Sequence, residues 1–122
     1  MPSRPATEDP DALLPLKPVE ALLLTMLTAG DRHGYGLRQD IIDHTGGKIA
    51  LEAGSLYRYL RRLEEAGALA EASGRHPAED DERRIYYRLT PFGKRVLAAE
   101  MVRLRSLVRL AEARRVIAPG RS

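Results

Sequence analysis

The sequence of 122 residues has no cysteine and no tryptophan, and its one phenylalanine is Phe92. Without cysteine the chain forms neither disulfides nor a thiolate metal site, which fits a cytoplasmic protein. Its longest apolar run, residues 21–24, is far too short to span a membrane. Residues 1–12 lack the apolar core of a signal peptide. These absences predict a cytoplasmic protein with no membrane partner.

Signatures of catalysis are also missing. The histidines at positions 33, 44 and 76 lie far apart, with no pair at the spacing of metal ligands. Neither a nucleophile–base set nor a glycine-rich phosphate loop is apparent. The sequence therefore predicts a protein that is not an enzyme and that holds no metal or cofactor.

Charge is distributed unevenly along the chain. The formal net charge is +3, but residues 1–90 carry a net −3 and residues 91–122 a net +6. Most of the basic side chains are arginine, which suits bidentate contacts with phosphate and guanine. An arginine-rich composition also fits a GC-rich coding sequence. The mild basic excess permits nucleic acid as a partner without demonstrating it.

Apolar periodicity and helix-end signals predict four helices and one hairpin. Three helices are expected over residues 18–29, 35–45 and 53–66, followed by strands over 68–73 and 84–89. A long helix over 91–117 follows, with Thr90 as its cap and Pro91 at its first position. Tyr35 is expected to lie between the first two helices. Of Tyr86 and Tyr87, on opposite faces of a strand, one should be core.

This order of elements is the plan of a winged helix-turn-helix. The fold class is mainly α with a small β-hairpin and a long C-terminal dimerisation helix. Four segments follow: a flexible N-terminal arm at 1–12, a winged helix-turn-helix DNA-binding domain at 13–90, the dimerisation helix at 91–117, and a tail at 118–122.

The third predicted helix has two distinct faces. On a wheel of about 100° per residue, one face collects the apolar side chains Leu56, Tyr59, Leu60 and Leu63. The opposite face has a small-residue first turn and three arginines: Gly54, Ser55, Arg58, Arg61, Arg62 and Glu65. Small residues let a helix end approach DNA, and arginines reach bases or phosphates. A solvated face balanced by Glu64 and Glu65 is the alternative, but the hairpin that follows favours DNA.

The long helix carries a short heptad seam. Its members follow each other at spacings of 4, 3, 4 and 3: Leu97, Met101, Leu104, Val108 and Ala111. A helix longer than so small a domain needs favours a seam between two subunits. The arginines around the seam are expected on a solvated face.

Four segments, in order, carry a resemblance to a known family: His33-Gly34-Tyr35-Gly36, Gly54-Ser55-Leu56-Tyr57, Leu60-Arg61-Arg62-Leu63-Glu64 with Gly67, and Arg84-Ile85-Tyr86-Tyr87-Arg88-Leu89-Thr90 leading to Gly93. Over about residues 16–110 the chain resembles the PadR family of transcriptional regulators, in its short branch with one C-terminal helix. The resemblance implies a dimeric repressor of detoxification, efflux or stress genes, often released by a small-molecule effector.

The chain departs from the family pattern in three places. Glu52 occupies a position near the third helix where the family often has a small hydroxyl residue; its carboxylate can cap the helix but repels phosphate. The hairpin tip is acidic at residues 79–82, so the arginines at its shoulders are better phosphate ligands than the tip. Because tryptophan is absent, an effector cannot stack between tryptophan rings, as it does in some relatives.

These observations lead to one hypothesis and one alternative. A homodimer binds double-stranded DNA at a palindromic operator whose half-sites lie about one helical turn, roughly 34 Å, apart. Base-edge contacts are assigned to Ser55, Arg58 and Arg61, and phosphate contacts to Tyr57, Arg62, Arg75, Arg83 and Arg84. The alternative, favoured by the acidic hairpin and the net −3 of residues 1–90, is a winged-helix protein-interaction module that does not bind DNA.

Overall fold

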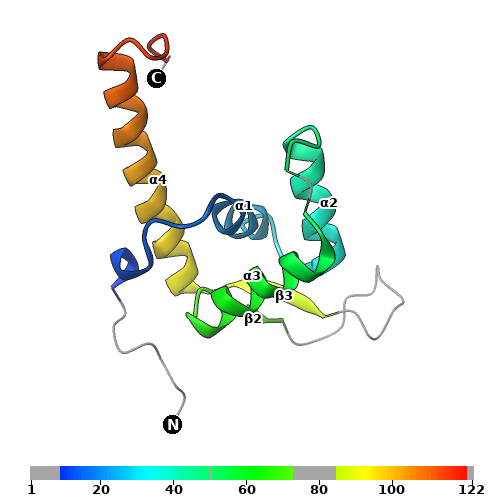
Figure 1. Ribbon diagram of the computed structural model, residues 1–122. Helices are drawn as coiled ribbons and strands as arrows, with labels where there is room; N and C mark the ends of the chain where they lie inside the picture. Colours follow the sequence, from blue (N-terminus) through cyan, green and yellow to red (C-terminus); the bar gives the residue numbers. More distant parts are fainter. Residues whose placement is uncertain (1–8, 50, 73–84, 121–122) are drawn as a thin grey trace.

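The computed structural model describes residues 9–49, 51–72 and 85–120. Its elements, in chain order, are η1 (Pro10–Leu13), α1 (Pro18–Leu27), β1 (Arg32–His33), α2 (Gly34–His44), α3 (Ala53–Glu65), β2 (Leu69–Glu71), β3 (Tyr86–Leu89) and α4 (Pro91–Ala113). Figure 1 shows α1 in the middle of the body, α3 and the sheet on one side of it, and α4 rising away from that side. This arrangement confirms the predicted fold class, mainly α with a small antiparallel sheet and a long C-terminal helix.

The sheet has three strands, one more than the predicted hairpin. Its order is β1-β3-β2 with both pairings antiparallel, and β1 pairs Arg32 with Tyr87. Strand β1 has two residues, too few for any alternation of apolar and polar side chains, so no sequence pattern marks it. Only pairing with β3 makes this segment a strand, and the pairing places the start of α2 beside the wing.

The core consists mainly of leucines from all four helices. Leu23 and Leu24 of α1 and Leu37 and Ile41 of α2 have no exposed surface. The apolar face predicted for α3 is confirmed, since Leu56, Leu60 and Leu63 are all buried. Burying a side chain of this size stabilises a fold by about 1.5–3 kcal/mol. Tyr87, not Tyr86, is the tyrosine of β3 that lies in the core.

Three helix ends follow from local chemistry. The Thr90 hydroxyl accepts the backbone N–H of Gly93 at 2.9 Å with Pro91 in the first turn, as predicted. Helix α3 ends where Gly67 takes a φ of 83° and the Ala68 N–H donates to the Leu63 carbonyl at 2.9 Å. Helix α4 ends by the same type of bond, from the Val116 N–H to the Ala111 carbonyl at 2.8 Å.

The predicted boundaries need correction at two helices. Helix α1 ends at Leu27 instead of residue 29. Helix α4 ends at Ala113 instead of residue 117, because Arg115 adopts a φ of 61°. Position 115 is not a glycine, so the sequence does not predict a left-handed backbone conformation at this point. At about 1.5 Å per residue, α4 is roughly 35 Å long.

The N-terminal segment joins the body earlier than predicted. Pro10–Leu13 form the short helix η1, which packs against α4, so residues 10–12 are not part of a flexible arm. Leu16 is buried, and its backbone donates a hydrogen bond to the Glu100 carboxylate of α4. Glu100 also pairs with Arg103, at 2.6 Å and 2.9 Å. These polar contacts tie the segment before α1 to the middle of α4.

Candidate nucleic-acid interface

Helix α3 presents its arginines outward, as its wheel predicted. Arg58, Arg61 and Arg62 are exposed on the face opposite the buried leucines. Ser55 is half-buried, and its hydroxyl accepts a hydrogen bond from the Arg58 guanidinium at 3.1 Å. These three arginines, within positions 58–62, form a basic strip that fits an anionic groove.

The first turn of α3 is open and uncapped by a side chain. Glu52 is the N-cap residue, but its carboxylate accepts no capping hydrogen bond, so its expected capping role is not seen. A Cβ added to Gly54 would meet nothing within 4 Å. The amino-terminal end of α3 is therefore accessible, with backbone N–H groups that favour phosphate.

Tyr57 lies at the junction of α3 and α2. A Cβ added to Gly34 would come within 2.8 Å of the Tyr57 hydroxyl oxygen and 3.0 Å of its ring. The ring thus rests on the backbone at the start of α2, and a side chain at position 34 would displace it. Tyr57 is still 48% exposed, so its hydroxyl can donate to a phosphate while the ring holds α3 and α2 in register.

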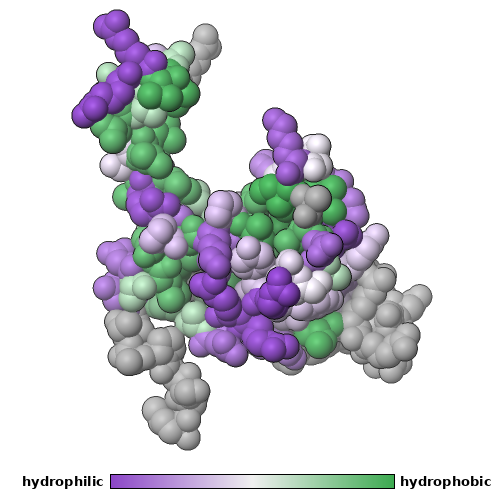
Figure 2. Space-filling model, in the orientation of Figure 1, coloured by the Kyte–Doolittle hydropathy of each residue, from purple (hydrophilic) through white to green (hydrophobic). Residues whose placement is uncertain are grey.

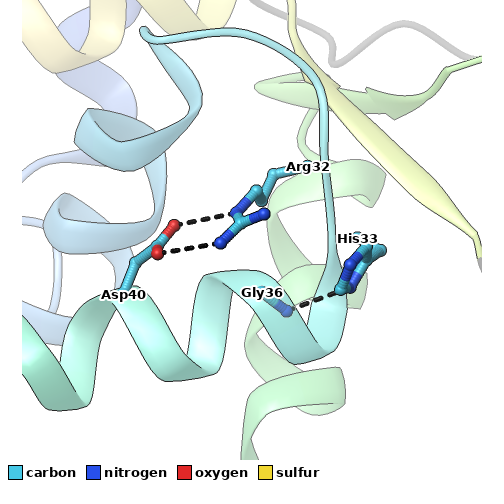
Figure 3. Close-up of polar contacts among 4 residues, drawn as sticks. All are labelled: Arg32, His33, Gly36 and Asp40. Atoms are coloured by element: carbon cyan, nitrogen blue, oxygen red, sulfur yellow. Dashed lines mark hydrogen bonds and ion pairs between the residues drawn. The ribbon is translucent and has the colours of Figure 1, made fainter. Parts of the chain in front are cut away.

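The start of α2 is held by an N-cap and an ion pair. His33 Nδ1 accepts the Gly36 N–H at 3.0 Å, and the Arg32 guanidinium binds both carboxylate oxygens of Asp40 at 3.0 Å and 3.1 Å (Figure 3). Arg32 lies across Gly36, since a Cβ there would meet its guanidinium carbon at 2.6 Å. These contacts fix the α2 end that faces Tyr57.

Tyr35 is a candidate interface residue that sequence reasoning missed. It was expected between the first two helices, yet it is 58% exposed. Its ring stacks against His33, with centroids 6.5 Å apart. The prediction failed because residues 34 and 36 turn inward at the helix start, which leaves Tyr35 on the outside. Its position beside Gly34 makes it a second candidate phosphate donor.

Carboxylates border the strip on the Tyr57 side. Burial raises the pKa of Glu64, and Glu71 and Glu65 raise it further. Burial also raises the pKa of Tyr87, with smaller contributions from Tyr57, Glu64 and Glu71. The negative charge gathered here confines the basic surface to the Arg58, Arg61 and Arg62 side of α3.

The predicted wing contacts cannot be placed. Arg75, Arg83 and Arg84, together with the acidic residues 79–82, lie outside the described residues. At the base of the wing, Arg88 of β3 pairs with Asp31 through two hydrogen bonds of 3.3 Å and 3.0 Å. This pair joins the central strand to the loop before β1.

The heptad seam of α4 divides into a covered and an uncovered part. Leu97 is buried in the chain's own core, so it is not free to meet a second subunit. Met101 and Val108 are exposed, and Leu104 and Ala111 are partly exposed. Figure 2 shows apolar surface along α4 beyond the body. The free seam therefore begins at Met101.

The described residues contain neither a metal cluster nor a membrane span. Within residues 9–49, 51–72 and 85–120, no group of three or more His, Asp and Glu could hold a metal ion. The same residues include no helix with the length and apolar character of a membrane span.

Three helices, a small wing and an outward basic face define the class of protein: a winged helix-turn-helix protein. Within that class, residues 23–99, more than half of the chain, match the Transcriptional regulator PadR-like family. The chain belongs to this family, as its motifs predicted. Because this is a family of transcription regulators, the prediction that the chain is not an enzyme is confirmed.

Two solved structures and one curated protein are similar to the chain. A PadR family transcriptional regulator from Eggerthella lenta is 29% identical, with a TM-score of 0.59 over 81% of this chain and 84% of that one. A transcriptional regulator from Clostridium thermocellum is 25% identical, with a TM-score of 0.67 over 78% and 87%. An uncharacterised protein from Lysinibacillus sphaericus is 29% identical over 80 residues, 66% of this chain and 72% of that protein.

Proposed function

We propose that this chain is a cytoplasmic transcriptional repressor that binds a palindromic operator as a homodimer and is released by a small-molecule effector. The observation that carries the proposal is the exposed strip of Arg58 and Arg61 on the third helix of a PadR-family winged helix. In this type of domain the corresponding helix enters the major groove, where arginine reads guanine through two hydrogen bonds.

Each contact residue has a role suited to its place. Arg58 and Arg61 face outward on α3, and Ser55 lies half-buried in its first turn; all three are assigned to base edges. Tyr57 and Tyr35, at the α2–α3 junction, are assigned to phosphates. Arg75, Arg83 and Arg84 keep their proposed phosphate contacts. Arg62 has a competing role, because its guanidinium lies 3.5 Å from the buried carboxylate of Glu20.

The uncovered seam supports the dimer. Met101, Leu104, Val108 and Ala111 extend the apolar face of α4 past the point where the body covers it. An apolar stripe left in water is unfavourable, and an identical stripe on a second copy buries both at once. Two α4 helices joined there hold two α3 helices as a pair, which is what a palindrome requires. The effector is assigned to the space between the paired helices.

The test begins with selection of duplex DNA from a random library by the full-length protein. Binding of the selected duplex should weaken steeply with salt, since cations on phosphates release counterions. Arg58→Ala with Arg61→Ala should lower the affinity roughly a hundred-fold, at about 1–3 kcal/mol for each base contact.

The matched control removes the same charge elsewhere. Arg105→Ala with Arg109→Ala changes two exposed arginines of α4 and should leave binding nearly unchanged. If the α3 double variant binds the selected duplex as well as the parent, α3 is not the recognition helix. If the parent selects no duplex, the chain acts as a protein-interaction module instead.

A further inference from the structure

Glu20 is a buried carboxylate at the start of α1. Its residue is 3% exposed, and its Oε1 accepts the Lys17 backbone N–H at 2.9 Å. Its Oε2 lies 3.5 Å from an Nη of Arg62 on α3. A carboxylate removed from water is unfavourable unless it is hydrogen-bonded and paired with a cation. Glu20 therefore has a reason to hold Arg62 that does not involve DNA.

A second contact joins the start of α1 to α3. Tyr59 precedes Arg62 by three residues, so both side chains lie on one flank of α3. The Lys17 ammonium lies 5.8 Å from the centre of the Tyr59 ring. Lys17 and Glu20, in and beside the first turn of α1, thus meet successive turns of α3. Arg58 instead donates to Ser55 on the outer face.

We infer that Arg62 is a positioning residue, which sets the rotation of α3 about its own axis through Glu20, and is not a phosphate ligand. The leucines of α3 cover one face only, and their close packing opposes a roll of the helix at that face. An ion pair on the flank resists it directly. Because Arg58 and Arg61 project far from the helix axis, a small roll displaces their guanidinium groups from the bases they contact.

The inference rests on the proposed function, but its first test does not require DNA. Glu20→Gln, Arg62→Met and the double variant of the full-length chain are compared by chemical unfolding. Glutamine keeps an oxygen that accepts the Lys17 N–H and loses only the charge. If the two residues act as a pair, the change in the unfolding equilibrium constant of the double variant should differ from the product of the two single-variant changes by about five-fold or more. A double-variant change that matches this product within about two-fold would overturn the pairing.

The second test measures affinity for the selected duplex over a range of salt concentrations. If Arg62 positions α3, Glu20→Gln and Arg62→Met each weaken binding roughly ten-fold and leave the salt slope unchanged. If Arg62 contacts phosphate, Arg62→Met lowers the slope by about 0.9 per site, and Glu20→Gln strengthens binding by freeing the arginine. That second pattern would overturn the inference.

The control is Glu52→Gln. Glu52 is the residue directly before α3; it is exposed and makes no capping hydrogen bond. Removing its charge should strengthen DNA binding or leave it unchanged, so a loss seen only with Glu20→Gln is not a general charge effect. A parent that selects no duplex refutes the proposed function alone, because the unfolding comparison still decides whether Glu20 and Arg62 act together.

Discussion

The two halves of α4 have one apolar stripe in common and different surroundings. In the first half, Val96 and Leu97 are buried against the chain's own body. In the second half, Met101 and Val108 continue the stripe but remain 37% and 45% exposed. The difference teaches that a periodic apolar pattern indicates a face that needs cover, but does not say which chain provides it.

The boundary between the halves has a physical marker. Glu100 is almost fully buried, and it accepts hydrogen bonds from Arg103 and from the Leu16 backbone. Up to this turn the segment from η1 to α1 packs on α4, and beyond it the helix leaves the body. A charged side chain that would be expected outside lies at the edge of the covered half.

The largest effect is expected from a methyl group in the covered half. Gly93→Ala would place a Cβ 1.8 Å from the Ala68 carbonyl oxygen, so the backbone must move. The free energy of unfolding should fall by more than about 3 kcal/mol, measured by chemical denaturation. Gly54→Ala is the control, because its Cβ meets nothing within 4 Å and alanine favours a helix. Equal stability of both variants would refute the close contact.

The next effect should appear in the uncovered half. Leu104→Asp with Val108→Asp places two charges in the seam and should raise the dimer dissociation constant about a hundred-fold or more. Sedimentation over a range of concentrations measures this constant. The monomer should keep its helical content, since the body does not rely on these residues. A variant that remains dimeric would show that subunits associate elsewhere.

At the boundary, a pH effect is expected. Hydrogen bonds from Arg103, followed by the charge of Arg103, hold the pKa of Glu100 below its ordinary value despite burial. The stabilisation is therefore fully present above the ordinary glutamate pKa and is lost as the pH falls through the lowered value. Glu100→Gln should cost about 1.5 kcal/mol at neutral pH and flatten the acid side of the stability curve. An unchanged pH profile would contradict this role.

The smallest effect is expected on the back of α4. Val102 is 63% exposed and lies two residues, about 200° of turn, before Leu104. Val102→Asp should change the free energy of unfolding by no more than about 0.5 kcal/mol and leave the dimer constant as it was. A dimer weakened as much as by the seam variant would place the interface around the whole helix.

Much of the fold follows from local patterns. The leucine spacing of α3, the Thr90-Pro91 start and Gly67 predicted elements that the structure confirms. Local chemistry acts over three or four residues, so it can be recognised along the chain. Strand β1 was missed because it is a strand only through its distant partner β3. Helix η1 has a local start signal, since Asp9 caps the Asp11 N–H and Pro10 is at its first position, but this signal was read as part of a flexible arm.

The candidate site also has features that the sequence predicted and features that only the tertiary structure showed. Helical periodicity alone placed Arg58 and Arg61 outside, because residues opposite the apolar face of a helix point away from the core. Tertiary structure alone showed that Arg62 meets Glu20, 42 positions earlier, that Tyr35 faces outward, and that Leu97 belongs to the core. Each of these depends on how separate elements are oriented toward each other, and no spacing within one element carries that information.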